Sequence, residues 1–444
     1  MNAFNDFWTS VVSLIWGLPL VILLTGAGAY FTIVTRFLPL RAFRHALDII
    51  RGKYDNPDDP GEISHFQALS SALSATVGMG NIAGVAVAVA IGGPGAIFWM
   101  WISGLVGMST KFFTCSLACM YRKEDEDGIP QGGPMYFIEV GLGRRFKFLA
   151  IMFACCGMIG TLSLFQSNQL ASLLFTDWNI PPFVTGFVAM ILVSMVVLGG
   201  ITRIGKATAR IVPAMCLLYF LACMFIVLSN FQQVPGLLLS IVTNGLGINA
   251  ALGGAAGVVV KEVMVTGIQR AAFSNEAGIG TAPMAHGAAK TTEPVREGMV
   301  AMIGPFIDTH VICTLTALVI LISGVSSEGG GIVMTAAAFE QAMPGIGSLL
   351  LTIVVIMFAI SSMISLSYYG LKCARYLFGK KRGGYYIYVY LVSILLAAMW
   401  SQGVILNIVD AAYGLMAIPT VLSTLALSPK VTVALKDYMQ RMKL

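Results

Sequence analysis

Charged side chains are scarce in this sequence. Aspartate, glutamate, lysine and arginine together make up 11% of its 444 residues, whereas about 25% is usual for a soluble domain. This scarcity excludes a soluble globular protein, a disordered chain and a nucleic-acid-binding protein, because each of these needs a far more charged surface. Hydrophobic residues instead make up 57% of the chain, and 48 residues are glycine.

The sequence also lacks the motifs of secretion, thiolate metal binding and common catalysis. No lysine or arginine precedes Arg36, so the basic start of a cleavable signal peptide is missing. The eight cysteines include no pair spaced by two residues, which is the spacing of thiolate metal sites. No P-loop, paired-histidine zinc motif or nucleophile elbow occurs. We therefore expect no enzyme and no organic cofactor.

Long hydrophobic stretches recur along the whole chain, as in a polytopic helical membrane protein. We predict an all-α membrane protein with eleven transmembrane helices and no soluble domain. The predicted segments are 14–35, 66–91, 95–121, 148–175, 183–200, 211–230, 251–286, 298–323, 347–371, 385–400 and 404–427.

Basic residues are confined to alternate linkers. Of the 27 lysines and arginines, all but Lys111, Lys261 and Arg270 lie in every second linker or in the C-terminal tail. The positive-inside rule then places the N-terminus outside and the C-terminus in the cytoplasm. We predict a multi-pass protein of a bacterial-type cytoplasmic (inner) membrane, with an amphipathic helix on the inner leaflet within residues 36–56.

Two of the predicted helices contain a polar, glycine-rich interruption. One runs from Ser74 to Gly84 and the other from Arg270 to Pro283, and each has two glycines spaced by one residue. Lipid tolerates a broken helix only where it lines a cavity, and interruptions at corresponding positions of two halves indicate a transporter binding site. The alternative is close packing of helices through glycine.

Such interruptions suit an amino acid and a cation. Free N–H groups at the start of a half-helix bind a carboxylate, and freed carbonyls with nearby hydroxyls bind a small hard cation. Ser361, Ser362, Ser365 and Ser367 form a third polar cluster, in which two adjacent hydroxyls next to a carbonyl one turn earlier could complete such a cation cage. The alternative for these serines is hydrogen bonding to their own helix.

Further polar residues lie within hydrophobic segments. Gln166 heads the polar run 166–169 and is our candidate for contacting a zwitterionic ligand, whereas its neighbours could simply bridge helices. Four acids are also predicted to be embedded in the membrane, where they would form structural ion pairs with Lys111, Lys261 and Arg270 or act in proton transfer or gating. These acids are Glu262, Glu276, Asp308 and Asp410.

Four motifs make the sequence resemble the alanine or glycine:cation symporter family. They span residues 71–84 (SALSATVGMGNIAG), 132–136 (GGPMY), 273–280 (FSNEAGIG) and 367–370 (SYYG). The resemblance covers nearly the whole chain. It implies Na⁺-driven uptake of small neutral amino acids and a leucine-transporter-like fold, with five-plus-five inverted repeats and one extra N-terminal helix.

The resemblance also implies a division of the chain. Residues 1–65 would form the extra helix and the amphipathic helix, 66–230 and 251–427 the two repeats, and 428–444 a cytoplasmic tail. The expected partners are a small neutral amino acid, Na⁺ and the lipid bilayer, with no nucleic acid and no obligate protein partner.

The resemblance implies two groups of site residues. Backbone N–H groups of Met79 and Gly80 would hold the substrate carboxylate, in a pocket completed by Thr76, Gln166, Phe273 and Leu366. The first Na⁺ would be bound by carbonyls of Ser74, Val77 and Phe358 and by hydroxyls of Ser361 and Ser362. The interruption at residues 76–81 is also similar to that of the neurotransmitter:sodium symporters, which implies a second Na⁺ at Thr76 and Asn81.

The sequence departs from the family at Leu366, where many members carry tryptophan. A smaller residue there would widen the pocket, so the expected substrate is alanine, glycine or a somewhat larger neutral amino acid. Proton coupling through Glu276 or Asp308 is the alternative within transport. A channel or a membrane nutrient sensor is the alternative from another class.

Overall fold

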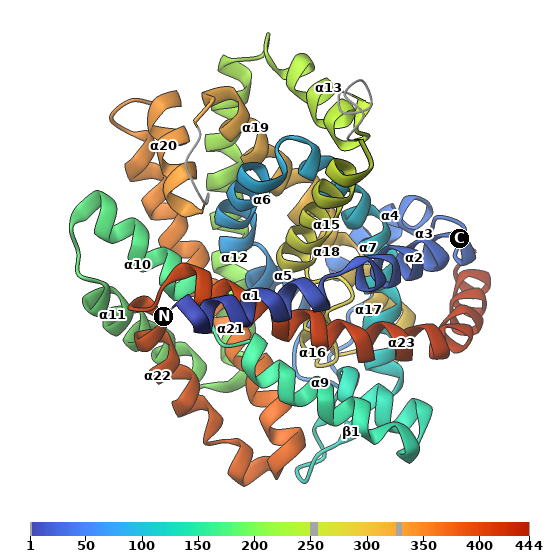
Figure 1. Ribbon diagram of the computed structural model, residues 1–444. Helices are drawn as coiled ribbons and strands as arrows, with labels where there is room; N and C mark the ends of the chain where they lie inside the picture. The colour runs from blue at the N-terminus through green and yellow to red at the C-terminus, as the bar shows by residue number, and fades with distance from the viewer. Residues whose placement is uncertain (1, 249–255, 326–330, 444) are drawn as a thin grey trace.

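The computed structural model describes residues 2–248, 256–325 and 331–443, and these residues are almost entirely helical (Figure 1). Besides loops, they include a short antiparallel hairpin, in which β1 (Lys123–Glu124) pairs with β2 (Pro130–Gln131). The predicted all-α character is therefore confirmed.

The helices fall into two sets, before and after the undescribed residues 249–255. The first set is α1 (Asn2–Ile15), α2 (Leu18–Val34), α3 (Leu38–Arg41), α4 (Phe43–Ile50), α5 (His65–Thr76), η1 (Gly80–Gly84), α6 (Val85–Gly92), α7 (Gly95–Met120), α8 (Pro134–Phe137), η2 (Ile138–Leu142), η3 (Arg144–Phe146), α9 (Lys147–Gly160), α10 (Leu164–Trp178), α11 (Pro182–Val197), α12 (Gly200–Ser229) and α13 (Val234–Gly245). The second set is α15 (Ala256–Asn275), α16 (Ala282–His286), α17 (Pro294–Ala301), α18 (Ile303–Pro305), η4 (Phe306–Cys313), α19 (Thr314–Ser323), α20 (Ile332–Ala342), α21 (Gly347–Gly383), α22 (Tyr386–Ala398) and α23 (Gln402–Met442).

Among the described residues, seven helical segments are long and apolar enough to cross a membrane, and one bent pair raises the number to eight. The bent pair consists of His65–Thr76 and Gly80–Gly92, which meet at 49°. All eight coincide with predicted segments. The chain is thus a multi-pass membrane protein.

The other three predicted segments correspond less completely to the described helices. Segments 183–200 and 385–400 correspond to α11 and α22, which are shorter apolar helices. Segment 251–286 begins among undescribed residues and continues as α15 and α16. The count of eleven spans therefore stays a prediction. Two helices outside the predicted segments, α13 and α20, follow α12 and α19.

Three of the helical segments have the wider π-helical turn. They are η1, directly after the break in the first bent span, η2, and η4, which continues the helix begun by α17 and α18. Such turns insert a residue into a helix and often occur at functional sites. The segments η1 and η4 pack against each other, so two irregular backbones meet in the middle of the molecule.

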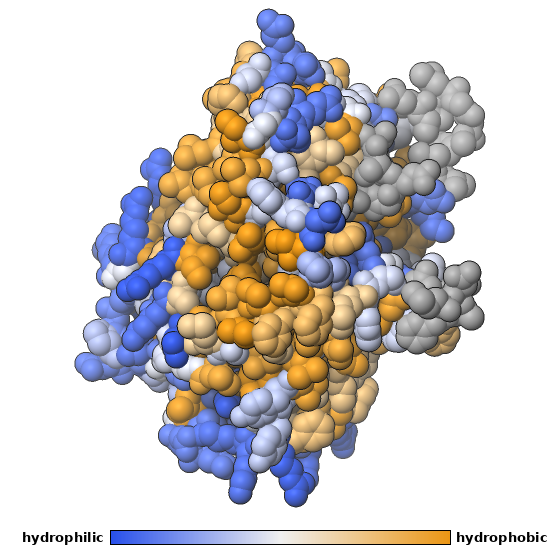
Figure 2. Space-filling model, turned by 90° about the vertical axis from the view of Figure 1, so that its left-hand side faces the viewer, coloured by the Kyte–Doolittle hydropathy of each residue, from blue (hydrophilic) through white to orange (hydrophobic). Residues whose placement is uncertain are grey.

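The interrupted helices occupy the centre of the fold. Figure 1 shows α5, α6, α15 and α16 surrounded by other helices, and α7 packs along both α15 and α17. On the face drawn in Figure 2, hydrophobic residues cover most of the middle, and hydrophilic residues gather toward the edges of the view. Large exposed hydrophobic side chains on α11, such as Phe183 and Phe187, are typical of a lipid-facing helix.

The segment predicted as an amphipathic helix contains α3 and α4. Helix α4 buries Ala46 and Ile49 against the protein. Its position on the inner leaflet stays a prediction.

Candidate functional site

The first interruption begins where α5 ends at Thr76. Val77 leaves the helical conformation, with φ −75° and ψ 94°, and the helix resumes at Gly80. The Gly78 N–H donates to Asn81 Oδ1 at 2.8 Å, which fixes the turn. Met79 and Gly80 open the new helical segment, where N–H groups have no partner within the helix. Their role in binding a carboxylate stays a prediction.

The second interruption follows α15. Glu276, Gly278 and Gly280 all have positive φ, at 54°, 87° and 101°, a conformation that glycine adopts without steric cost. Asn275 stabilises the turn, because its Oδ1 accepts the Ala277 N–H at 2.9 Å. The chain becomes helical again at Ala282. Both predicted interruptions are thus present.

The two interruptions touch each other. A Cβ atom at Gly80 would lie 3.2 Å from Ser274 Cα and 3.4 Å from Phe273 Cδ1. A side chain at this position would therefore be tight against the second interruption, and glycine lets the two backbones approach without displacing it. The structure therefore joins Gly80 and Phe273, two of the residues predicted to bind substrate, in one place.

The predicted Na⁺ ligands gather where α5 meets α21. Ser362 Oγ donates to the Ser74 carbonyl at 2.8 Å, and Ser361 Oγ donates to the Phe358 carbonyl at 3.0 Å. A Cβ atom at Gly78 would lie 2.3 Å from Ser362 Oγ, so the interruption directly adjoins these serines. Oxygen atoms of this kind are the ligands that hard cations prefer.

The cage is fully enclosed by protein. Ser74, Val77, Phe358, Ser361 and Ser362 each have 0% of their surface exposed. Val77 lies at the interruption, although no described contact joins its carbonyl to the two serines. The Ser361 hydroxyl bonds the Phe358 carbonyl of its own helix, as the alternative interpretation expected, and also contacts the Met215 sulfur of α12 at 3.2 Å. The Ser362 hydroxyl bonds across to α5. Both hydroxyls would turn toward a cation bound between the two helices.

The other serines of this helix do not join the cage. Ser367 Oγ donates to the Ile364 carbonyl of its own helix at 2.6 Å. Ser365 Oγ is buried without a hydrogen-bond partner. Neither of these two hydroxyls has a described hydrogen bond to the residues predicted to bind Na⁺.

A second polar centre forms around Asp308, which lies on η4 and is 0% exposed. Asn81 Nδ2 donates to Asp308 Oδ1 at 2.7 Å, and Ser274 Oγ donates to Oδ2 at 2.7 Å. Thr309 Oγ1 also donates to Oδ2, at 2.9 Å. One carboxylate therefore binds side chains from both interruptions.

This centre differs from the predicted second Na⁺ site. The sequence paired Asn81 with Thr76, but the Thr76 hydroxyl donates to the Ala72 carbonyl of its own helix at 3.1 Å. The structure instead groups Asn81 with Ser274 and Asp308. The sequence marked Asp308 as an embedded acid and a candidate for proton coupling, but not as a neighbour of both interruptions, because nothing in its spacing shows that η4 faces them.

An aromatic cluster covers Phe273. Its ring lies edge-on to Phe165, with centroids 5.1 Å apart, and 5.8 Å from the ring of Tyr413. Gln166 follows Phe165 on α10 and is 8% exposed. Leu366 is buried on α21, and no described contact connects it with the interruptions. Its place in a substrate pocket stays a prediction.

The polar neighbours of Gln166 bridge helices, as the alternative interpretation expected. Ser167 Oγ donates to the Ile394 carbonyl at 2.6 Å, and Asn168 Nδ2 donates to the Trp400 carbonyl at 2.7 Å. The Gln169 side chain accepts the Ile332 N–H at 3.1 Å. These three residues hold α10 against its neighbours, which leaves Gln166 as the candidate ligand residue.

The embedded acids have separate environments. Asp410 forms a buried ion pair with Arg270 and also accepts a hydrogen bond from Gln269 at 2.9 Å. Glu276 accepts hydrogen bonds from Thr281 and from the Tyr413 hydroxyl. Glu262, by contrast, is exposed and borders a cavity of about 500 Å³.

The Arg270–Asp410 pair lies beside the aromatic cluster. The guanidinium carbon of Arg270 is 5.4 Å from the centre of the Phe273 ring. Gln269, the hydrogen-bond partner of Asp410, lines the same cavity as Glu262. The pair thus contacts both Gln269, which lines this cavity, and the Phe273 ring, and a gating role for it stays a prediction.

Comparison with known proteins identifies relatives along the whole length of the chain. The sequence model described as the sodium:alanine symporter family matches residues 1–444. An uncharacterised transporter of Haemophilus influenzae is 40% identical, over 98% of this chain and 96% of its own. The sodium/alanine symporter AgcS of Methanococcus maripaludis is also 40% identical, over 96% of this chain and 95% of its own.

A solved structure shares the fold. The crystal structure of MhsT in complex with L-phenylalanine superimposes with a TM-score of 0.60 over 83% of this chain and 89% of MhsT, at 15% sequence identity. This likeness shows that the helices adopt a leucine-transporter-like arrangement.

Proposed function

The chain belongs to the sodium:alanine symporter family, and from this membership we propose that it imports small neutral amino acids together with Na⁺ by alternating access. Its family consists of amino-acid symporters and not of enzymes. The observation that carries the proposal is the hydroxyl of Ser362 on α21, which donates to the Ser74 carbonyl of α5 beside the interruption, next to the buried hydroxyl of Ser361. The cage would hold one Na⁺ directly beside the substrate site.

One Na⁺ provides enough free energy for accumulation. A single charge crossing 100 mV contributes about 2.3 kcal/mol, and a tenfold Na⁺ gradient adds about 1.4 kcal/mol. Together these terms support a substrate gradient of several hundred-fold for a zwitterion.

The substrate would bind between the two interruptions. The N–H groups of Met79 and Gly80 would hold its carboxylate, and Phe273 would cover it from the side of the Arg270–Asp410 pair. Gln166 and Leu366 would line the pocket for the substrate side chain. Thr76 would contact the substrate through its backbone and not through its hydroxyl. Leucine at position 366 favours acceptance of neutral amino acids larger than alanine.

Asp308 favours a second coupling ion. A buried carboxylate beside the substrate carboxylate is unfavourable unless a positive charge lies between them. A Na⁺ bound by Asp308, Asn81 and Ser274 would supply that charge, and a proton on Asp308 would remove the conflict instead. The number and kind of ions therefore depend on this centre, and proton coupling remains the second candidate.

We further propose the arrangement in the membrane. Eleven helices would cross a bacterial-type inner membrane, with five-plus-five inverted repeats at 66–230 and 251–427 and one extra helix at the N-terminus. The N-terminus would lie outside and the tail 428–444 in the cytoplasm. The alternation of basic linkers supports this orientation.

The proposal is tested by uptake into proteoliposomes with imposed ion gradients. Alanine, glycine and larger neutral amino acids would be offered in turn, with an inward Na⁺ gradient, an inward H⁺ gradient or neither. We expect accumulation above equilibrium with Na⁺. A channel would equilibrate the amino acid without accumulation, and a sensor would bind it without uptake.

A further inference from the structure

A cavity of about 240 Å³ lies where the ends of α2 and α3 meet the last turns of α23. Among the described residues that line it, three are basic and none is acidic. The basic residues are Arg36, Arg41 and Lys436. The cavity takes no part in the cation and substrate sites described above, and those sites do not account for its charge.

The positive charge of this cavity is not neutralised by neighbouring acids. Within the part of the chain that the structure describes, no acidic side chain forms an ion pair with any of the three basic residues. Another cavity differs in this respect, because Lys147 on its lining pairs with Glu139 at 3.3 Å. A concave surface that carries charge of one sign concentrates ions of the opposite sign. The cavity is thus suited to an anion.

The backbone after α2 brings two of the basic residues together. Arg36 and Phe37 have positive φ, at 52° and 56°, a left-handed conformation that is uncommon for residues other than glycine. The chain therefore turns between α2 and α3, and Arg41, the last residue of α3, lines the same cavity as Arg36. Both arginines belong to the folded connection between these two helices.

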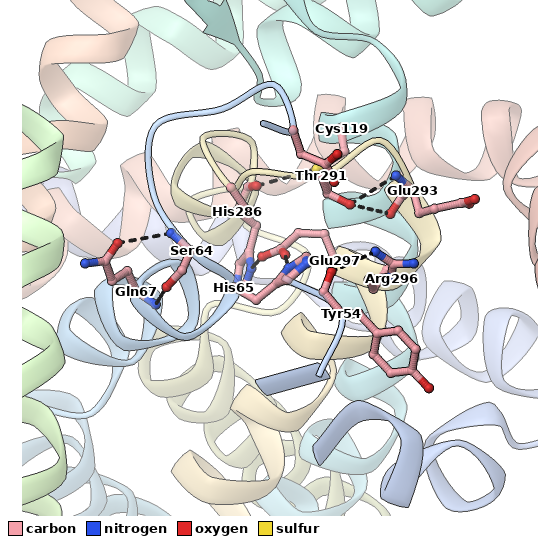
Figure 3. Close-up of polar contacts among 12 residues, drawn as sticks. Tyr54, Ser64, His65, Gln67, Cys119, His286, Thr291, Glu293, Arg296 and Glu297 are labelled. Atoms are coloured by element: carbon pink, nitrogen blue, oxygen red, sulfur yellow. Dashed lines mark hydrogen bonds and ion pairs between the residues drawn. The ribbon is translucent and has the colours of Figure 1, made fainter. Parts of the chain in front are cut away.

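The third basic residue is held in place by contacts on the other side of α23. A hydrogen bond of 2.8 Å joins the Tyr438 hydroxyl to Nε2 of His45 on α4. Arg441 pairs at 2.7 Å with Glu293, which directly precedes α17 (Figure 3). These contacts fasten the last turns of α23 to the protein. The exposed side chain of Lys436 is therefore held at the cavity.

Exposed hydrophobic side chains on two neighbouring helices lead to the cavity. Val34 ends the first membrane-spanning segment and lines the cavity, and Tyr30 and Ile33 before it are exposed. On α23, Val433 is exposed one turn before Lys436. Helices α2 and α23 pack against each other, so an apolar surface borders the cavity on both helices. A ligand that fits this arrangement has a negative head and apolar chains.

We propose that the cavity binds the phosphate of an anionic phospholipid, whose acyl chains lie along α2 and α23. Basic pockets between transmembrane helices on the cytoplasmic side bind such headgroups. In the proposed orientation, this end of α2 faces the cytoplasmic leaflet, where anionic lipids attract basic residues. A free phosphate ion would use the charges but leave the apolar surface unoccupied. A zwitterionic headgroup would bring a positive group to a cavity that is already positive.

Native mass spectrometry of the purified full-length protein in detergent tests the proposal. Phosphatidylglycerol and phosphatidylcholine with identical acyl chains would be titrated separately, and the bound fraction of each lipid would be measured. We expect one phosphatidylglycerol molecule to bind roughly tenfold more tightly than phosphatidylcholine. Equal affinities for the two lipids would overturn the proposal.

Substitution of the basic residues tests whether the lipid binds in this cavity. The variant Arg36→Gln, Arg41→Gln, Lys436→Gln should bind phosphatidylglycerol roughly 100-fold more weakly, and Lys436→Gln alone roughly fivefold more weakly. The three side chains are exposed, so both variants should keep the fold, which thermal unfolding checks. If neither variant binds phosphatidylglycerol more weakly, the cavity is not the site.

The matched control removes the same charge elsewhere. Arg144→Gln, Arg145→Gln, Lys381→Gln replaces three exposed basic side chains that do not line this cavity. We expect its affinity for phosphatidylglycerol to equal that of the unsubstituted protein. If the control loses as much affinity as the cavity variant, the protein attracts the lipid only through its overall charge, and the proposal is wrong.

Inorganic phosphate distinguishes a lipid from a free anion. Phosphatidylglycerol should raise the unfolding temperature of the unsubstituted protein but not that of the triple variant at 36, 41 and 436. Inorganic phosphate, added alone, should leave both unfolding temperatures unchanged. Equal stabilisation by inorganic phosphate would show that the cavity takes a free anion, and it would overturn the assignment to a lipid.

A photoreactive phosphatidylglycerol with a diazirine on its acyl chain locates the bound lipid. After illumination, it should label peptides from α2 and from the last turns of α23, and this labelling should disappear in the triple variant. Helix α11, which also exposes hydrophobic side chains such as Phe183, is the reference for general contact with lipid. Labelling of α11 as strong as that of α2 would contradict a specific site.

Discussion

At the scale of single residues, the cage depends on two adjacent hydroxyls with unequal partners. Ser362 reaches the carbonyl of Ser74 on another helix, whereas Ser361 bonds within α21. Replacing both by alanine removes two oxygen ligands from a dehydrated ion, at a cost of about 1–3 kcal/mol. We predict that Ser361→Ala with Ser362→Ala raises the half-maximal Na⁺ concentration roughly 5- to 150-fold, measured as Na⁺-dependent uptake.

The matched control lies on the same helix. Ser367→Ala removes a buried hydroxyl that bonds only the Ile364 carbonyl of its own helix, so its Na⁺ dependence should match the unsubstituted protein. If the double variant at 361 and 362 keeps its Na⁺ dependence at normal expression, the Na⁺ site lies elsewhere.

In the proposed function, the number of coupling ions depends on Asp308. Asp308→Asn keeps the size of the side chain but removes the charge that a second cation would neutralise. We predict that the sigmoidal dependence of uptake on Na⁺ becomes hyperbolic in this variant. If Asp308 carries a proton instead, the variant loses the pH dependence of uptake. A variant with unchanged Na⁺ cooperativity and unchanged pH profile would show that Asp308 has only a structural role.

A substitution at position 366 tests whether this residue determines the substrate preference. Leu366→Trp restores the bulk that many relatives carry, so it should exclude larger neutral amino acids while alanine or glycine uptake persists. Competition of a panel of unlabelled amino acids against labelled alanine measures this directly. An unchanged competition profile would mean that residue 366 does not line the substrate pocket.

At the scale of helices, the second interruption depends on glycines packed against other elements. Gly280 has φ 101°, and a Cβ atom there would lie 2.6 Å from both Phe153 and Thr420. We predict that Gly280→Ala destabilises the protein by about 2–5 kcal/mol, from left-handed strain and overpacking together. The measurement is thermal unfolding in detergent.

A second glycine distinguishes the effect of backbone strain from the effect of overpacking. Gly379 in α21 also has positive φ, at 77°, but a Cβ atom there would have nothing within 4 Å. Gly379→Ala should therefore cost only the backbone strain of about 1–2 kcal/mol. Equal losses of stability in the two variants would show that packing at Gly280 contributes nothing.

The helices and both interruptions could be predicted from the sequence because hydrophobic length and paired glycines are local signals. The contacts between these elements could not be predicted from the sequence. Asp308 meets Asn81 and Ser274 only because the π-helical turns of η1 and η4 set which side chains face each other. The hydroxyl of Thr76 likewise turns to its own helix, a choice that the motif alone does not reveal.

The buried contacts of Glu297 with His65 and His286 (Figure 3) could not be predicted from the sequence for a similar reason. His65 and Glu297 are separated by 232 positions, and neither belongs to a spaced motif. Only the folded chain brings the start of α5 to the start of α17. Such long-range polar pairs depend on how helices pack, so hydropathy and local spacing carry no signal for them.

At the scale of the whole molecule, the distribution of basic residues predicts the orientation of the chain in the membrane. We predict that a membrane-impermeant thiol reagent applied to intact cells labels Asn2→Cys and spares Asp58→Cys, in a background without accessible native cysteines. Permeabilised cells, in which both positions react, provide the control. The reverse labelling pattern would invert the proposed topology.

The central claim is that the chain couples amino-acid movement to Na⁺ through the cage between α5 and α21. Its most direct test is alanine uptake into proteoliposomes under an inward Na⁺ gradient, comparing the unsubstituted protein with the Ser361→Ala, Ser362→Ala double variant and with Ser367→Ala. We predict accumulation above equilibrium for the unsubstituted protein and for Ser367→Ala, and a shift to much higher Na⁺ concentrations for the double variant. Accumulation that is indifferent to Na⁺, or equally Na⁺-dependent in all three proteins, would contradict the claim.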